Sequence, residues 1–272
     1  MAVNVDSTEI FSNLSSKIGN LLFGRREGDW TLLSNTLDEL NSINYRYTVV
    51  RNPTKAVLLI NQCCSFIPCD DDILVRKFSK LLYSLVKGQN IAVEGRTLTV
   101  LVQWLLNGLK IKDSDVVLVV LQALEAVLRS NTDNLAPLAA NTTKEVCDLI
   151  NNKKVECPTE ILLLSLQCLE ACTSVPSDFK SKDREGFNLH FGLCAKTFMH
   201  YLNKSPINFD DILHSKVLKV CLSGIQNVII QDPVYLTQEL GSILGVIKTF
   251  MLYGIKGVDF LAPQKILPST LS

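Results

Sequence analysis

An internal repeat is the feature of this sequence that most limits the folds open to it. Residues 121–127 read LQALEAV and residues 166–172 read LQCLEAC, so five of seven positions are identical at a separation of forty-five residues. Around the first copy, residues 116–128 are apolar except for Gln122 and Glu125, which lie on one narrow stripe of a helix. A helix with so little polar surface must be covered on most of its sides.

The predicted helices extend this period over most of the chain. Those that come second in each predicted pair begin near residues 29, 70, 113, 159 and 210, at intervals of 41, 43, 46 and 51. A period of about 40 to 47 residues with one helical hairpin per period is typical of HEAT and armadillo solenoids. We therefore predict an all-α fold, an α-α superhelix of about five HEAT- or armadillo-like hairpins plus one unpaired C-terminal helix. The predicted helices cover residues 8–23, 29–43, 53–66, 70–87, 93–109, 114–130, 135–150, 159–174, 187–202, 210–230 and 235–253.

The domain prediction follows from the same pattern. Residues 1–254 are predicted to form a single α-solenoid, with an irregular, charged loop inside it at 175–188. Glycines and prolines after residue 253 interrupt helical structure, so residues 255–272 are predicted as an irregular C-terminal tail. The helix at 235–253 has apolar residues for two neighbours and no mate after it, and we expect the chain to be a truncated or alternative form of a longer protein.

Composition narrows the function classes. The formal net charge is zero, the pI is about 6.8 and 47% of residues are hydrophobic. This favours an ordered protein and argues against a general binder of nucleic acid or anionic membranes, which needs an excess of Lys and Arg. The sequence starts without a basic, apolar leader and contains no run of eighteen apolar residues. We expect an intracellular protein, cytoplasmic or nuclear, with no membrane span.

Neither a metal site nor a catalytic motif is predicted. The nine cysteines are odd in number and most lie in apolar helical patterns, as free buried thiols do. Cys63, Cys64 and Cys69 lack the paired clusters of a zinc site, and His190 and Cys194 lack a third and fourth ligand. No recognised signature surrounds a cysteine or serine nucleophile, so we predict no enzyme activity, no cofactor and no small-molecule substrate.

Three consecutive carboxylates at residues 70–72 have two explanations. They are suited to the start of a helix, where backbone N–H groups and the helix dipole favour negative charge. A calcium loop instead needs oxygen ligands at alternating positions and a glycine turn, and position 74 is leucine. The sequence therefore predicts helix capping here.

The polar stripes on the second helices are the best functional lead. In α-solenoids these helices commonly line the concave face, so their polar residues are candidates for a mixed-charge groove that holds a peptide or helix. The alternative is an ordinary solvated face. The candidate groove residues are Arg76, Lys80, Gln122, Glu125, Arg129, Gln167, Glu170, Lys216 and Lys219.

Several segments resemble the amino-terminal region of the HEAT repeat-containing protein 6 family. Residues 59–68 (LINQCCSFIP) and 74–82 (LVRKFSKLL) look like its early repeats, and residues 240–254 (LGSILGVIKTFMLYG) are the most similar segment. Asp72, followed by Val75 and Arg76, is similar to the Asp–Val–Arg element of HEAT repeats in general, which is missing elsewhere in the chain. The resemblance implies a helical-repeat scaffold without active-site residues, from proteins several times longer.

The sequence is compatible with two kinds of function. The first is a non-catalytic helical-repeat scaffold that mediates protein–protein interaction, with partners that the sequence does not identify. The second is a nucleocytoplasmic transport or nucleic-acid-associated adaptor that uses a concave groove. It needs a basic concave stripe, and Lys216 and Lys219 are too few to form one.

Overall fold

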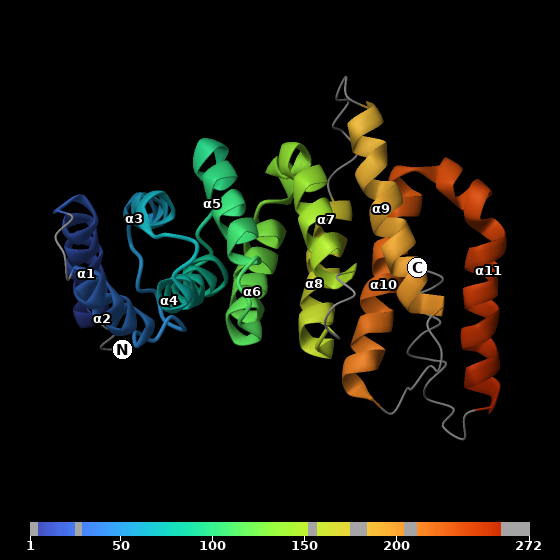
Figure 1. The fold of residues 1–272 in the computed structure, drawn as a ribbon, viewed down its shortest axis with the longest axis horizontal. Helices are drawn as coiled ribbons and strands as arrows, with labels where there is room; N and C mark the ends of the chain where they lie inside the picture. The colour runs from blue at the N-terminus through green and yellow to red at the C-terminus, as the bar shows by residue number, and fades with distance from the viewer. Residues whose placement is uncertain (1–4, 25–28, 152–156, 175–183, 204–210, 257–272) are drawn as a thin grey trace. The chain divides into compact units, whose positions relative to one another are not determined.

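A computed structural model describes residues 5–24, 29–151, 157–174, 184–203 and 211–256, and every regular element in these ranges is helical (Figure 1). The α-helices agree with the eleven expected from sequence periodicity. Two short elements, η1 (Ser84–Gly88, π-helical) and η2 (Thr132–Asn134, 3-10), follow α4 and α6. The α-helices are α1 (Val5–Gly24), α2 (Asp29–Asn41), α3 (Pro53–Phe66), α4 (Asp72–Tyr83), α5 (Gly95–Gly108), α6 (Ser114–Ser130), α7 (Ala136–Asn151), α8 (Thr159–Thr173), α9 (Arg184–Asn203), α10 (Ile212–Gln231) and α11 (Pro233–Lys256).

When η1 is counted with α4, most helix ends lie within two residues of the prediction, and three differ by three residues. The first of these is the start of α1, at Val5 instead of residue 8. The helices α3 and α6 begin and end at the predicted residues. In contrast, α9 begins at Arg184, inside the segment predicted to be irregular; the part of that segment at 175–183 lies outside the described residues. The last helix, α11, continues through Gly254 to Lys256, past its predicted end at residue 253. A single glycine costs a helix only about 1 kcal/mol relative to alanine, so it did not terminate α11.

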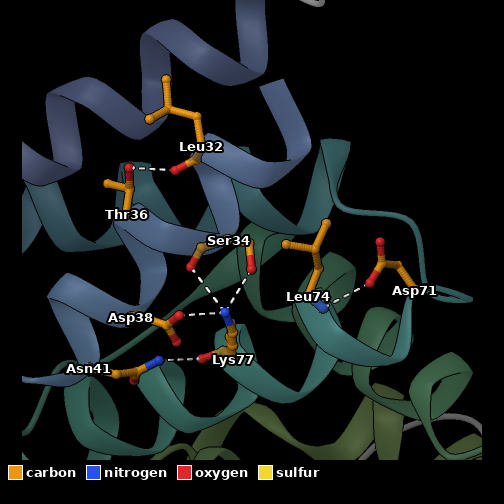
Figure 2. Close-up of polar contacts among 8 residues, drawn as sticks. All are labelled: Leu32, Ser34, Thr36, Asp38, Asn41, Asp71, Leu74 and Lys77. Atoms are coloured by element: carbon orange, nitrogen blue, oxygen red, sulfur yellow. Dashed lines mark hydrogen bonds and ion pairs between the residues drawn. The ribbon is translucent and has the colours of Figure 1, made fainter. Parts of the chain in front are cut away.

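Side-chain capping explains where several helices begin. The carboxylate of Asp71 accepts a hydrogen bond from the backbone N–H of Leu74 at 2.9 Å, which confirms capping by the acidic residues 70–72 (Figure 2). Asp113 and Asp211 cap α6 and α10 through the backbone N–H two residues on, each at 2.8 Å. Such caps satisfy N–H groups that the first turn leaves without partners, and each stabilises its helix by about 1 kcal/mol.

The chain divides into two compact units, residues 1–134 and 135–272. Within the first unit, α1 packs on α3 and α3 on α5, while α2 packs on α4 and α4 on α6. Within the second, α7 packs on α9, α8 on α10, and α11 on α10. The pairs α5–α6 and α7–α8 are also in contact, as predicted. Contact between alternate helices is compatible with stacked hairpins, and the prediction of one continuous solenoid over residues 1–254 stays a prediction.

Both copies of the internal repeat lie at buried positions on second helices. Leu121 and Leu124 in α6, and Leu166 and Leu169 in α8, are each 0% exposed. The equivalent glutamines are half-buried. The two copies therefore serve the same purpose, which is to fill the space between packed helices with apolar side chains.

A glutamine holds the linker between α2 and α3 in place. The Gln89 amide oxygen accepts hydrogen bonds from the backbone N–H groups of Val49 and Val50 at 2.8 and 3.1 Å. Its amide nitrogen donates to the carbonyl oxygens of Tyr45 and Tyr47, both at 2.8 Å. One side chain from the end of the α4 region thus satisfies four backbone groups of a segment about forty residues earlier. We refer to this arrangement as the Gln89 clasp.

Other linkers of the first unit are anchored in a similar way. The indole N–H of Trp104, in α5, donates to the carbonyl oxygen of Ile67 at 3.0 Å, just after α3. The side-chain oxygen of Asn131, at the end of α6, accepts from the backbone N–H of Val93 at 3.3 Å. The Trp104 contact therefore ties the second hairpin to the third, whereas the Asn131 contact holds the segment that leads into α5 against the end of the same hairpin.

Candidate interaction surface

Helix α4 has one side that faces α2 and another that faces solvent. On the side toward α2, the Lys77 ammonium donates to the hydroxyl of Ser34 at 2.7 Å and pairs with the carboxylate of Asp38 (Figure 2). The Asn41 side chain donates to the backbone carbonyl of Lys77 at 2.9 Å. Arg76 and the residue four positions later, Lys80, are exposed. Of the cations of α4, Lys77 thus contacts α2, whereas Arg76 and Lys80 face solvent.

The polar stripe of α6 is largely used within the helix itself. Glu125 is buried, at 9% exposure, and its carboxylate accepts from the guanidinium of Arg129, four residues on. Such a pair stabilises a helix by only about 0.2 to 0.5 kcal/mol, but it satisfies a charge that burial would otherwise penalise. Gln122 is half-buried and Arg129 is exposed. Of the predicted groove residues on α6, Arg129 is therefore the one most open to a partner.

In the second unit, α8 and α10 are joined by polar contacts. The Glu170 carboxylate accepts a hydrogen bond from the Ser223 hydroxyl at 2.7 Å. The Asn227 side chain donates to the Ser174 hydroxyl at 2.9 Å, at the end of α8. Gln167 is half-buried in α8, and the two predicted groove residues of α10, Lys216 and Lys219, are exposed.

The structure therefore divides the predicted groove residues into three groups. Gln122 and Gln167 are half-buried. Glu125 and Glu170 are bound to neighbouring groups of the fold. The exposed members are all cations: Arg76, Lys80, Arg129, Lys216 and Lys219.

Sequence reasoning missed the residues that join neighbouring second helices. Lys77 meets Asp38 across 39 positions, and Ser223 and Asn227 meet residues of α8 across 53 positions. A helical pattern shows which residues share a face of one helix, but it does not show which side chains of two helices lie opposite each other. Lys77 directly follows Arg76, and because adjacent residues of a helix do not share a face, this was a sign of a second polar direction on α4.

The buried thiols have environments that disfavour the reactive thiolate form. Seven of the nine cysteines are buried, and only Cys69 and Cys157 are partly exposed. Burial raises the pKa of Cys172 to about 12, and it raises the pKa of Cys194 well above its usual range. The Sγ of Cys194 lies 3.5 Å from the hydroxyl oxygen of Thr143. Because the thiolate is the nucleophilic form, thiols that stay protonated at neutral pH act as small apolar groups in packing.

The histidine and cysteine of α9 that share a helical face are both buried. His190 stacks on Phe191 with ring centroids 4.3 Å apart, and Cys194 contacts Thr143 as described. Among the residues that the structure describes, no group of three or more His, Cys, Asp or Glu side chains is placed to hold a metal ion. In the same part of the chain, no helix is long and apolar enough to cross a membrane.

The fold and this surface define an all-helical protein in which helices pack against their next and next-but-one neighbours within each unit. No protein-family model matches the sequence, and no solved structure matches the chain.

Proposed function

We propose that this chain is a non-catalytic scaffold of HEAT-like helical repeats that binds other proteins through the solvent-exposed faces of its second helices. The resemblance to the HEAT repeat-containing protein 6 family supports this proposal, as does the repeat of residues 121–127 at 166–172. In a solenoid, stacked hairpins turn individual helix faces into an extended surface. That surface suits a macromolecular partner better than a small molecule.

The observation that carries the proposal is the adjacency of the second helices. In the first unit α2, α4 and α6 pack side by side, and in the second unit α8 packs on α10. In each unit, one of these second helices carries a pair of exposed cations on one side. The pair is Arg76 and Lys80 on α4 in the first unit, and Lys216 and Lys219 on α10 in the second.

Site-specific photo-crosslinking in cell extract tests this proposal. A photoreactive amino acid is placed on a second helix, at Lys80 or at Lys216, and the crosslinked species are identified by mass spectrometry. The matched controls place it on first helices, at Asn13 of α1 or Lys144 of α7, which are also exposed. We expect protein crosslinks from the second helices and few from the first.

Two outcomes contradict the proposal. Equal crosslinking from both sets of positions shows that no surface is preferred, and crosslinks confined to the first helices place binding on the opposite face. Crosslinks to nucleic acid in place of protein instead favour the adaptor function considered from the sequence.

A further inference from the structure

The solvent face of α4 and η1 carries three cations. Arg76 and Lys80 are four positions apart in α4 and so share a side of that helix. Lys87 belongs to the π-helical η1 and lies over the ring of Tyr83, which is seven positions after Arg76 on α4. All three are exposed, and no ion pair joins any of them to another described residue. We refer to these residues, with Ile73 and Tyr83 on the same side, as the α4 ridge.

Two further features make the ridge more than three separate charges. The Lys87 ammonium lies over the ring of Tyr83, 5.2 Å from its centroid, a distance at which a cation is attracted to the ring face. At the other end, Ile73 is 62% exposed three positions before Arg76. The ridge therefore has an apolar end, three cations and one aromatic ring along a length of about 20 Å, at about 1.5 Å per residue.

Carboxylates also lie near the ridge. Asp72 is exposed in the first turn of α4, four positions before Arg76. On α2, which packs against α4, Asp38 and Glu39 are exposed and pair with Lys77 and Lys17. A nucleic acid or an anionic bilayer presents negative charge over a wide area and so meets these carboxylates as well as the cations. A narrow acidic protein segment can follow the ridge alone. Charge complementarity thus favours a peptide over a polyanion.

We infer that the α4 ridge binds an acidic segment of a partner protein, with Asp or Glu side chains on Arg76, Lys80 and Lys87 and an apolar side chain against Ile73. The guanidinium of Arg76 is suited to a carboxylate because it can donate two parallel hydrogen bonds. This inference rests on the proposed function and names the chemistry of the partner for one of its surfaces.

Fluorescence anisotropy with the full chain tests the inference directly. The probe is a labelled, Glu-rich helical peptide with one leucine near an end, and its matched control has Gln in place of every Glu. We expect the Glu peptide to bind, the Gln peptide to bind at least about tenfold more weakly, and added salt to weaken binding because exposed charge pairs are screened.

Charge reversal locates the binding site. The combined variant Arg76→Glu, Lys80→Glu and Lys87→Glu should lose at least about tenfold in affinity, while Lys80→Arg and Lys87→Arg together, with Arg76 kept, should retain it. Reversal of three other exposed cations of the same unit changes the net charge equally and should cost no more than about twofold. Circular dichroism checks that each variant is folded. If the charge-reversed variant unfolds, a variant with Gln at Arg76, Lys80 and Lys87 replaces it. The control cations are Arg46, Arg51 and Arg96.

Three results overturn the inference. They are equal affinity for the Glu and Gln peptides, equal loss in the ridge and control variants, and tighter binding of single-stranded oligonucleotides or anionic vesicles than of the peptide. Failure here is distinct from failure of the proposed function. If Lys80 crosslinks to proteins but the chain does not bind the acidic peptide, only the inference about the ridge is refuted. If the second helices give no protein crosslinks, the scaffold function is refuted, and the peptide measurement still decides the inference about the ridge.

Discussion

Removing the Gln89 side chain should loosen the linker between the first two hairpins. The Gln89→Ala variant loses the four hydrogen bonds of the clasp and leaves the buried Val49 and Val50 segment without its partners. A typical hydrogen bond contributes about 1 kcal/mol net, and the half-buried setting lets water replace part of the loss. We therefore expect the free energy of unfolding to fall by about 2 to 4 kcal/mol. This is smaller than the loss expected if each of the four backbone groups were left buried without any partner.

The Gln89→Glu variant tests the polarity of the clasp. It keeps an acceptor for the two N–H groups but turns a carboxylate oxygen toward the carbonyl oxygens of Tyr45 and Tyr47. This repulsion raises the pKa of the introduced carboxyl in the folded state. The folded state then binds the proton more tightly than the unfolded state, so the variant is more stable below the unfolded pKa and loses that stability as pH rises through the folded pKa.

Urea unfolding followed by circular dichroism measures both effects, and amide hydrogen exchange at Val49 and Val50 reports the linker itself. Substitution of Gln238, which is exposed on α11, by Ala and Glu provides the matched control. A loss below about 0.5 kcal/mol in Gln89→Ala, with unchanged exchange at the two amides, would refute the role given to the clasp.

Three further predictions concern packing and thiol chemistry. Leu124→Ala should lower the unfolding free energy by about 2 to 5 kcal/mol because this leucine is fully buried, and a loss below about half a kilocalorie in urea unfolding would contradict its placement. Gly224→Ala should destabilise the protein by at least about 1 kcal/mol because the added methyl group overlaps the buried ring of Phe198. Gly245→Ala meets no neighbour and should stabilise the protein by up to about 1 kcal/mol. Stability changes of the same sign for both variants in thermal unfolding would be inconsistent with this packing. Under native conditions, an aromatic disulfide reagent should modify Cys69 and Cys157 first, and mass spectrometry that finds a buried thiol reacting as quickly would disprove the burial pattern.

Much of the helical structure could be predicted because its signals are local. The apolar periodicity around residues 116–128 and the caps at Asp71 and Asp113 depend on groups within a few positions of one another. Two of the predicted ends that failed, at Arg184 and after Gly254, are places where the local signal was weak. Charged residues such as those near 184 form helices readily without an apolar face, and one glycine is a mild penalty.

The candidate surface was predictable only in part. Sequence reasoning placed Arg76 and Lys80 on a polar face, and both are exposed. It grouped Glu125 and Glu170 with them, because a polar residue in a stripe looks the same whether it faces water or a neighbouring group. The structure assigns Glu125 to Arg129 and Glu170 to Ser223.

By itself, then, the sequence determined that the chain forms amphipathic helices with a period near forty-five residues, because helix formation and capping are short-range. Tertiary structure decided which polar side chains tie hairpins together and which stay open to a partner. Gln89 reaches back 40 positions to Val49, and Lys77 reaches 39 positions to Asp38. Contacts at such separations depend on how two helices lie side by side, a property that neither helix encodes alone.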